Sequence, residues 1–456
     1  MKKITFLLIF ILIFGFTGCE GTKNDSTLTE NEWEFYNECA EKFVKFMANG
    51  DFASAEVMFD SAMKKLVPKS VLQKDIWDVI TAKAGAFVDI HAIENITVDG
   101  YYICFVTSRH ELIGVKLRVV FSKDGLIAGL FTEDYPMIAE ESREGAQRDG
   151  FTDFPVIIGE ETDFPLNGIL SMPNNITEKM PAVVLVHGSG SHNMDEAIYA
   201  NKPFRDIADF LAANGIAVIR YDKRGFVYGT ELIQKFGGSF TVYEETIEDA
   251  VLAAEVLKSN AYIDENKIFI IGHSLGGMLA PRIHAEGGNF AGIISLAGSP
   301  RFLLDISYDQ QMVEIDKITD SEEKESQLLL IENYDEEVQA LLNLSDEEAK
   351  KTPVANGTSA YYFKDMYRHP VSEYTKNITV PFLIMQGSED FQVYSDKDYI
   401  LWQELLEGRS NATFKLYDGL NHLFMTSTTG DIEEYKIPGN VENQVLSDMA
   451  EWIKVN

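Results

Sequence analysis

Cysteine is scarce in this sequence, and its spacing is unlike that of metal sites or disulfide scaffolds. The 456 residues include three cysteines, at positions 19, 39 and 104. So few cysteines exclude a disulfide-rich fold, and none stands beside another cysteine or a histidine with zinc-site spacing. Cys39 and Cys104 could form one disulfide, but sequence alone cannot pair them. Buried free thiols are the simpler interpretation.

Positive charge is also scarce. The chain has 39 Lys and Arg residues against 72 Asp and Glu residues, a formal net charge of −33. This excess argues against nucleic-acid binding and against electrostatic attraction to anionic membranes. The apolar fraction of 45% allows a large core, and the length predicts two or three domains.

A long apolar run stands at the N-terminus. Lys2 and Lys3 precede the apolar residues 4–16, and Thr17-Gly18-Cys19 follows. This pattern predicts a signal peptide over residues 1–18. Its end resembles a bacterial lipobox, with Phe16 in the place of the usual leucine, which predicts lipidation of Cys19. We therefore expect a lipid anchor at the cell membrane, on the extracytoplasmic side, or secretion if the lipobox is not used.

A polar tether (19–30) precedes a first domain over residues 31–135. Its first half has apolar residues at helical spacing, and its second half alternates with a period of two. The predicted strands are 87–93, 101–109, 115–122 and 126–132, with hairpin turns at 99–100 and 124–125. This α+β pattern resembles a nuclear-transport-factor-like cone, similar to a domain of unknown function that precedes some bacterial hydrolases. A spacer or a dimer surface is the expected role, although its cavity could hold a ligand.

A charged linker (136–152) follows. The pattern of residues 153–456 then predicts a catalytic domain built on a mostly parallel α/β sheet. Apolar strands alternate with helical patterns, and such sheets carry their sites at the carboxyl ends of the strands. A helical cap is expected as an insertion over about 301–375. Its segment 305–350 contains fifteen acidic residues and three lysines, which indicates a solvated face.

The segment 267–280 contains a G-x-S-x-G motif between a buried strand and a helix. Gly272 and Gly276 flank Ser274, which is typical of a nucleophile on a strained strand-to-helix turn. The alternative is a small-residue turn that only packs a helix on a strand. Because serine is a poor nucleophile at its ordinary pKa, a base must lie nearby.

His422 is the predicted base and Asp390 the predicted acid. His422 lies in a glycine-containing loop after the last strand, and Asp390 follows the strand before it. Glu389 and Asp396 are rivals for the acid. The chain order of nucleophile, acid and base is that of the α/β-hydrolase fold.

Backbone N–H groups should bind the oxyanion of the tetrahedral intermediate. The predicted donors are Leu275, directly after the serine, and Ser189 in the His187-Gly188-Ser189-Gly190 loop. The expected substrate-binding residues are His192, Tyr361, Tyr362 and Met366. For the last three, the alternative is that they belong to the plain core. His273 adjoins the serine, and we expect its side chain to point away from the turn.

The chain from about Asp153 onward resembles bacterial α/β-hydrolases of the carboxylesterase kind. The segments that carry the resemblance are 187–190, 195–196, 201–204, 220–224, 272–277 and 387–390. It implies hydrolysis of carboxylic esters, small or medium in acyl size, without a metal or organic cofactor. A peptidase, thioesterase or lactonase on the same fold remains open, as does a non-catalytic surface-binding lipoprotein. The oligomeric state is not predicted.

Overall fold

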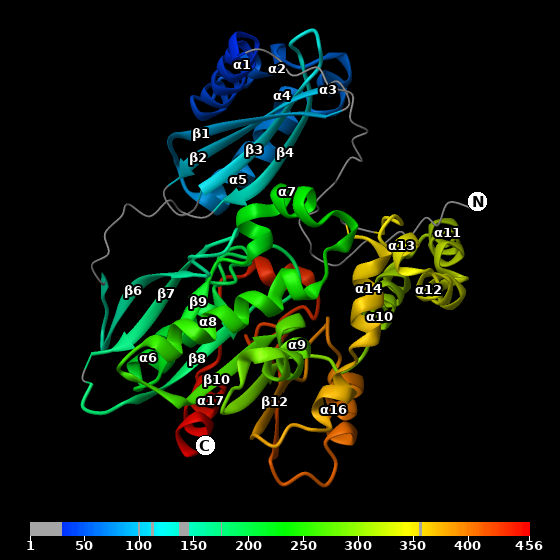
Figure 1. Cartoon of the computed structure of the whole chain (residues 1–456). Coiled ribbons are helices and arrows are strands. Elements are labelled where there is room, and N and C mark those ends of the chain that lie inside the picture. Colours follow the sequence, from blue (N-terminus) through cyan, green and yellow to red (C-terminus); the bar gives the residue numbers. More distant parts are fainter. Residues whose placement is uncertain (1–29, 99–100, 111–113, 136–145, 175, 355–357) are drawn as a thin grey trace. The chain divides into compact units, whose positions relative to one another are not determined.

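The computed structural model describes residues 30–98, 101–110, 114–135, 146–174, 176–354 and 358–456. The predicted signal peptide, Cys19, the hairpin turn at 99–100 and linker residues 136–145 lie outside these ranges, as does the predicted tether up to residue 29. The chain divides into two compact units between residues 142 and 143 (Figure 1), and each is described by itself. No helix among the described residues is both long and apolar enough to cross a membrane.

The N-terminal unit pairs short helices with an antiparallel sheet. Its helices are α1 (Glu30–Ala48), α2 (Phe52–Val57), α3 (Ser61–Leu66), α4 (Lys69–Val71), η1 (Leu72–Trp77) and α5 (Asp78–Ala84). The sheet has the order β1 (Phe87–Val98), β2 (Tyr101–His110), β3 (Gly114–Phe121), β4 (Ile127–Tyr135). Asp51 and Asp60 cap α2 and α3 by accepting backbone N–H bonds, which explains why the helical pattern breaks there. The predicted α+β meander is confirmed.

The second unit is built on a nine-stranded sheet with the order β13-β12-β11-β10-β8-β9-β7-β6-β5. The parallel strands are β8 (Met180–Val186), β9 (Ala217–Tyr221), β10 (Ile263–His273), β11 (Gly292–Leu296), β12 (Phe382–Gly387) and β13 (Ala412–Tyr417). An antiparallel edge contains β5 (Ala146–Gln147), β6 (Phe151–Ile158) and β7 (Leu166–Pro173). The sheet therefore begins inside the stretch predicted as linker, because 146–147 pair with 152–153.

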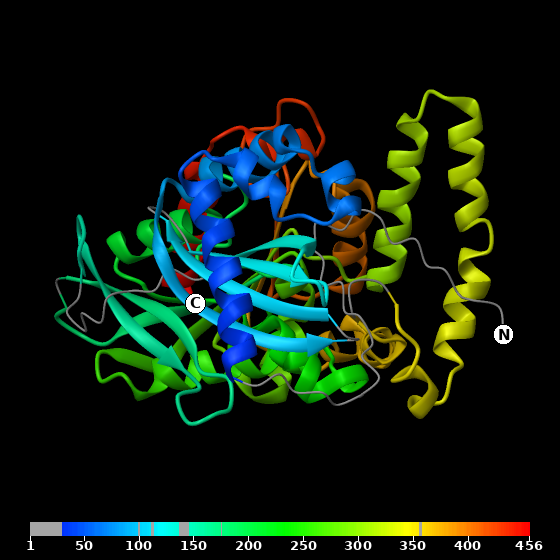
Figure 2. The ribbon, with the colours of Figure 1, turned by 90° about the horizontal axis from the view of Figure 1, so that it is seen from above.

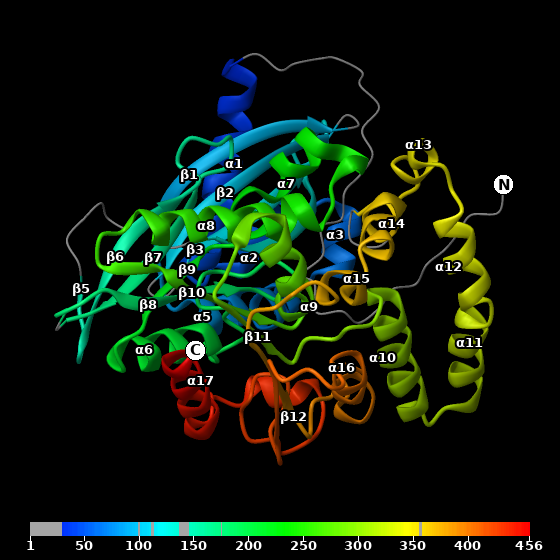
Figure 3. The same ribbon diagram turned by 60° about the horizontal axis from the view of Figure 1, so that its bottom comes forward.

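Helices cover both faces of this sheet (Figure 3). Along β8, Val183 and Leu185 join one buried cluster with α6 (Pro203–Ala213) and α17 (Asn443–Val455). Val184 and Val186 join the other cluster, with α8 (Glu248–Ser259) and α9 (Leu275–Ile283). Successive side chains of β8 therefore point into opposite cores. Because both faces of the strand are buried, its sequence is an unbroken apolar run.

The remaining helices of this face are α7 (Arg224–Phe236), η2 (Gly237–Ser239), η3 (Tyr243–Ile247) and η4 (His284–Gly288). Towards the C-terminus come η6 (Ser395–Tyr399), α16 (Ile400–Leu405) and η7 (Ile432–Lys436). Helix α7 was not predicted. Gly229 interrupts it with φ 1° and ψ −80°, a non-helical conformation that glycine permits.

The insertion between β11 and β12 is helical, as predicted. It contains α10 (Leu303–Lys317), α11 (Ser321–Ile331), α12 (Tyr334–Leu342), α13 (Asp346–Ala349), α14 (Ala360–Arg368) and α15 (Val371–Thr375). Figure 2 shows α10, in yellow-green, lying beside the consecutive helices α11 and α12, which run from yellow-green to yellow. In α12, Tyr334, Val338 and Leu341 are buried whereas Asp335 and Glu336 are exposed, which is the solvated acidic face expected from the sequence.

Candidate active site

Ser274 occupies a strained turn between β10 and α9. Its backbone has φ 52° and ψ −115°, a conformation that L-residues rarely adopt. The N–H of Ser274 donates to the carbonyl of Leu296 at 2.8 Å, which ties the turn to the neighbouring strand. The predicted strand–turn–helix context of the motif is confirmed.

The two motif glycines permit close backbone packing around this turn. A Cβ atom on Gly272 would lie 2.2 Å from the carbonyl oxygen of Gly276. A Cβ atom on Gly276 would lie 2.2 Å from the carbonyl oxygen of Val186. Any side chain at either position would therefore push α9 off the sheet and displace the serine.

His422 and Asp390 lie together in the buried loops after β13 and β12. His422 Nδ1 is 2.7 Å from Asp390 Oδ2. Asp390 Oδ1 accepts the N–H groups of Gln392 and Val393, at 2.8 and 2.9 Å, so the carboxylate is held from both sides. Glu389 is exposed, which makes it the weaker rival for contact with a buried imidazole.

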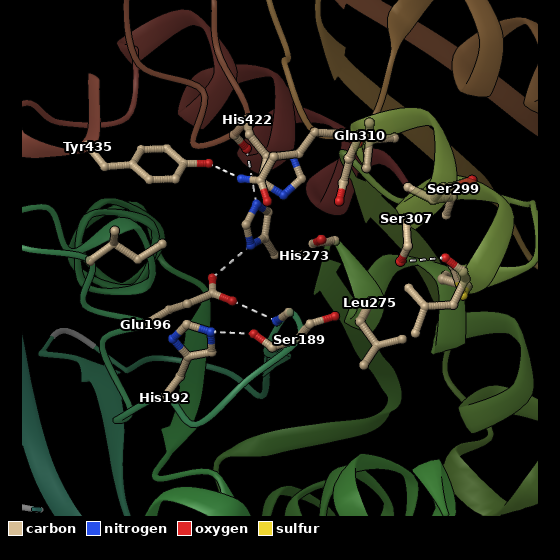
Figure 4. A pocket seen from close by; sticks show the side chains of 18 residues that line it. Ser189, His192, Glu196, His273, Leu275, Ser299, Ser307, Gln310, His422 and Tyr435 are labelled. Atoms are coloured by element: carbon tan, nitrogen blue, oxygen red, sulfur yellow. Dashed lines mark hydrogen bonds and ion pairs between the residues drawn. The ribbon is translucent and has the colours of Figure 1, made fainter. Parts of the chain in front are cut away.

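A pocket brings these loops to the serine (Figure 4). Its lining combines Ser274 and His422 with the loop after β8 and with helices α9 and α10. It includes Ser189, His192, Leu275, Met278, Leu303, Ile306, Ser307 and Gln310. Helix α10 of the insertion therefore lines the pocket that contains Ser274, and so does His192.

The aromatic cluster of the cap does not line this pocket. The hydroxyl of Tyr362 donates to Glu245 Oε2, and Tyr361 has Lys350 Nζ 4.9 Å from its ring centre. Met366 lines a neighbouring cavity instead. Of the expected substrate-binding residues, Tyr361 and Tyr362 therefore line neither space, whereas Met366 lines the second cavity. The part of the cap that reaches this pocket is α10.

The loop after β8 packs directly against the serine. A Cβ atom on Gly188 would lie 3.1 Å from the Cβ of Ser274. The carbonyl of Gly188 accepts from Lys223 Nζ at 2.8 Å, and the carbonyl of Ser189 accepts from His192 Nε2 at 2.7 Å. Leu275 opens α9, so its N–H has no partner within the helix and is free to bind an anion.

Two buried charged groups lie beneath the pocket, Glu196 and His273. Glu196 Oε2 is 3.0 Å from His273 Nδ1, and both side chains are almost completely buried. Burial opposes charge on both groups. The carboxylate nevertheless raises the pKa of His273, and the imidazole lowers the pKa of Glu196 to about 2. Burial lowers the pKa of His187 to about 3, so that ring is neutral.

Two of these positions were not foreseen as site residues. His273 does not point away, because its ring centre is 4.7 Å from that of His422 and it lines the pocket. Glu196 was noted only as part of a family segment. An acidic pair in a loop carries no sign that one of its members is buried, so the available signal was its place in that segment.

Fold and site together define a serine hydrolase of the α/β-hydrolase fold. Residues 177–428 match the family described as serine aminopeptidase, S33, and the chain belongs to that family. Residues 40–130 match a family described as protein of unknown function, DUF3887. The predicted pairing of such a domain with a bacterial hydrolase is confirmed.

The chain is also similar to individual proteins of known name. Esterase EstD of Thermotoga maritima is 32% identical over 417 residues, which cover 90% of this chain and 93% of the relative. Among solved structures, Est1E from Butyrivibrio proteoclasticus has 17% identity and a TM-score of 0.40, covering 66% of this chain and 96% of its own. An esterase of Pyrococcus furiosus has 19% identity and a TM-score of 0.42, covering 67% and 91%.

Proposed function

We propose that this serine hydrolase cleaves carboxylic esters, with Ser274 as nucleophile, His422 as general base and Asp390 as the acid that orients His422. The observation that carries the proposal is the buried His422–Asp390 contact of 2.7 Å, in a loop that lines the same pocket as the strained Ser274. The 32% identity to Esterase EstD over nine-tenths of the chain supports an ester as substrate.

The chemistry follows from which imidazole nitrogen is engaged. Because a carboxylate only accepts hydrogen bonds, His422 Nδ1 carries the proton and Nε2 is left to accept the proton of the serine hydroxyl. Ser274 Oγ then bonds to the carbonyl carbon, and the N–H groups of Leu275 and Ser189 stabilise the oxyanion. Collapse expels the alcohol, which takes the proton from His422. A water then repeats the sequence and releases the acid.

Size favours a small acyl group next to the serine. The pocket there has a volume of about 70 Å³, whereas the neighbouring cavity holds about 340 Å³. Drug-sized ligands occupy pockets of about 300–1,000 Å³. An acetyl-sized group therefore fits beside Ser274, and a medium chain requires the second cavity.

Removing the nucleophile or the base tests the assignment. Ser274→Ala and His422→Ala should each lower kcat for a soluble acyl ester by about 10⁴–10⁶-fold. Asp390→Asn should lower kcat by about 10³–10⁴-fold, because the base remains but its tautomer and orientation are lost. Full activity of Asp390→Asn together with a dead Glu389→Gln would move the acid role to Glu389.

A peptidase is the second candidate, since the family is described as serine aminopeptidase. A matched panel of esters, thioesters, lactones and aminoacyl amides separates the alternatives by kcat/KM. Labelling by a fluorophosphonate separates any of these enzymes from a non-catalytic binding protein, because only an activated serine reacts.

We also propose that Cys19 is lipidated and holds the enzyme at the outer side of the cell membrane. The basic start, apolar run and Gly18-Cys19 junction support this placement. Cys19→Ser should release the protein from the membrane fraction, and unchanged membrane association would contradict the anchor.

A further inference from the structure

The backbone N–H and C=O of Gly188, which packs against the serine, are both held by buried side chains, Glu196 and Lys223. Glu196 also connects this loop to the base. Glu196 Oε1 accepts the N–H of Gly188 at 2.6 Å. Its second oxygen lies 3.0 Å from His273 Nδ1. His273 Nε2 in turn lies 3.0 Å from the carbonyl oxygen of His422 (Figure 4). One continuous chain of contacts therefore joins the oxyanion loop, the residue before the nucleophile and the base.

The protonation of His273 follows from its two neighbours, the hydrogen-bonding carbonyl of His422 and the Glu196 carboxylate in ion-pair contact. The carbonyl of His422 only accepts, so His273 Nε2 must carry a proton. A lone pair on Nδ1 would face the Glu196 carboxylate and be repelled, so Nδ1 carries a proton as well. His273 is then an imidazolium and Glu196 a carboxylate, a buried ion pair in which the atoms of both ions face partners.

Burying these two charges costs free energy, and removing only one of them costs more. Glu196 is 1% exposed, and its backbone adopts φ 49°, a strained value for a residue with a Cβ atom. Such a residue persists when its surroundings hold it, and removing one member of a buried pair leaves the other charge unpaired. Neither Glu196 nor His273 bonds to the carboxylate that orients the base, which is Asp390.

We propose that Glu196 and His273 are positioning residues that hold the oxyanion loop and the backbone of His422 in register around Ser274. The geometry gives each a distinct function. Glu196 keeps Gly188 against the serine, so that the next N–H, that of Ser189, can reach the oxyanion. His273 holds the carbonyl of His422, so that the ring keeps its distance from the nucleophile. This inference rests on the proposed triad.

Substitution of Glu196 separates its geometry from its charge. Glu196→Ala leaves both Gly188 and His273 without their acceptor, and kcat should fall by about 10²-fold or more with KM little changed. Glu196→Gln can still accept from Gly188 and can donate to a neutral His273, which keeps its bond to His422. This variant should retain kcat to within about tenfold, a rescue that loss of folding would not give. His273→Ala should resemble Glu196→Ala.

Kinetics are compared per active site, counted by fluorophosphonate titration, so that unfolded protein does not contribute. Asp249→Ala is the matched control, because it breaks the buried Arg224–Asp249 pair between α7 and α8. It should lower the melting temperature but leave kcat of the folded enzyme unchanged.

Wild-type kcat in folded Glu196→Ala would overturn the proposal, and so would a Glu196→Gln enzyme as impaired as Glu196→Ala. Failure of the triad itself would be seen separately, as ester hydrolysis that survives in Ser274→Ala.

Discussion

Glu434 holds the loop that carries His422, the proposed base. Its Oε1 accepts from the hydroxyl of Ser427 and from three successive N–H groups at residues 428–430, at 2.6–2.7 Å. Its Oε2 accepts from Asn421 Nδ2 at 3.0 Å, and Asn421 is the residue before His422. Burial by itself would raise the pKa of Glu434, but these donors lower it to about 2 from an ordinary value of 4.5.

Glu434→Gln should destabilise the enzyme. The NH₂ group of the introduced amide must face hydrogen-bond donors, either those around Oε1 or the Nδ2 group of Asn421. The free energy of unfolding should fall by about 1–3 kcal/mol, the cost of leaving buried donors unpaired. A group whose pKa is lowered by folding contributes stability above its unfolded pKa and loses it towards its folded pKa. The difference between wild type and variant should therefore be full above pH 4.5 and shrink towards pH 2.

Urea titrations at several pH values measure this difference. Glu433→Gln is the control, since Glu433 is exposed and pairs with Lys436. Its free energy of unfolding should stay within about 0.5 kcal/mol of wild type. A Glu434→Gln deficit that is constant from pH 7 to pH 3 would contradict the assigned role of the carboxylate.

Individual elements differ in how well the sequence predicts them. The mostly parallel sheet was predicted, because β-branched runs buried on both faces leave an unambiguous pattern. Helix α7 was not predicted; it contains Gly225 and Gly229, and glycine lowers helix propensity. The contact between Asp390 and His422 followed from chain order, whereas the partner of Tyr362 did not. Its acceptor, Glu245, stands 117 residues away, and aromatic spacing alone gives no indication of such a bond.

The small pocket and the larger cavity share two lining residues, one from α9 and one from the first turn of α10. Met278 and Leu303 line both spaces, and Met366 and Val371 line the far one. Met278 is one turn along α9 from Ser274, about 6 Å at the helical rise. In the proposed reaction, a medium acyl chain that extends from Ser274 into the larger cavity passes these two side chains.

Leu303→Ala should open this passage and Leu303→Trp should close it. With Leu303→Ala, kcat/KM for octanoyl esters should rise relative to acetyl esters, by about tenfold for 1–2 kcal/mol of added apolar contact. With Leu303→Trp, acetyl esters should remain substrates while octanoyl esters are lost. Leu341→Ala is the control, since Leu341 is buried in α12 and lines neither space. A uniform factor across all chain lengths would mean that the cap does not select the acyl group.

On the scale of the whole molecule, each unit has a core of its own. One buried cluster draws on the N-terminal unit alone, with Phe43, Phe59 and Leu117 among its members. The two clusters on the sheet of the other unit draw on residues from Ile158 onward. Because each core closes without residues from the other unit, each unit should fold independently.

A chain that begins at Arg143 should therefore fold and keep its chemistry. The groups assigned to catalysis and positioning, from Gly188 to Glu434, belong to the second unit. We expect kcat/KM for a soluble acetyl ester to stay within about threefold of the full chain, a difference below 1 kcal/mol in barrier height. Ser274→Ala in the shortened chain supplies the background rate. A folded but tenfold slower enzyme would show that the N-terminal unit contributes to the reaction. Unchanged kinetics would instead direct the search for its role to binding or spacing, measured by the oligomeric state of residues 30–135 expressed alone.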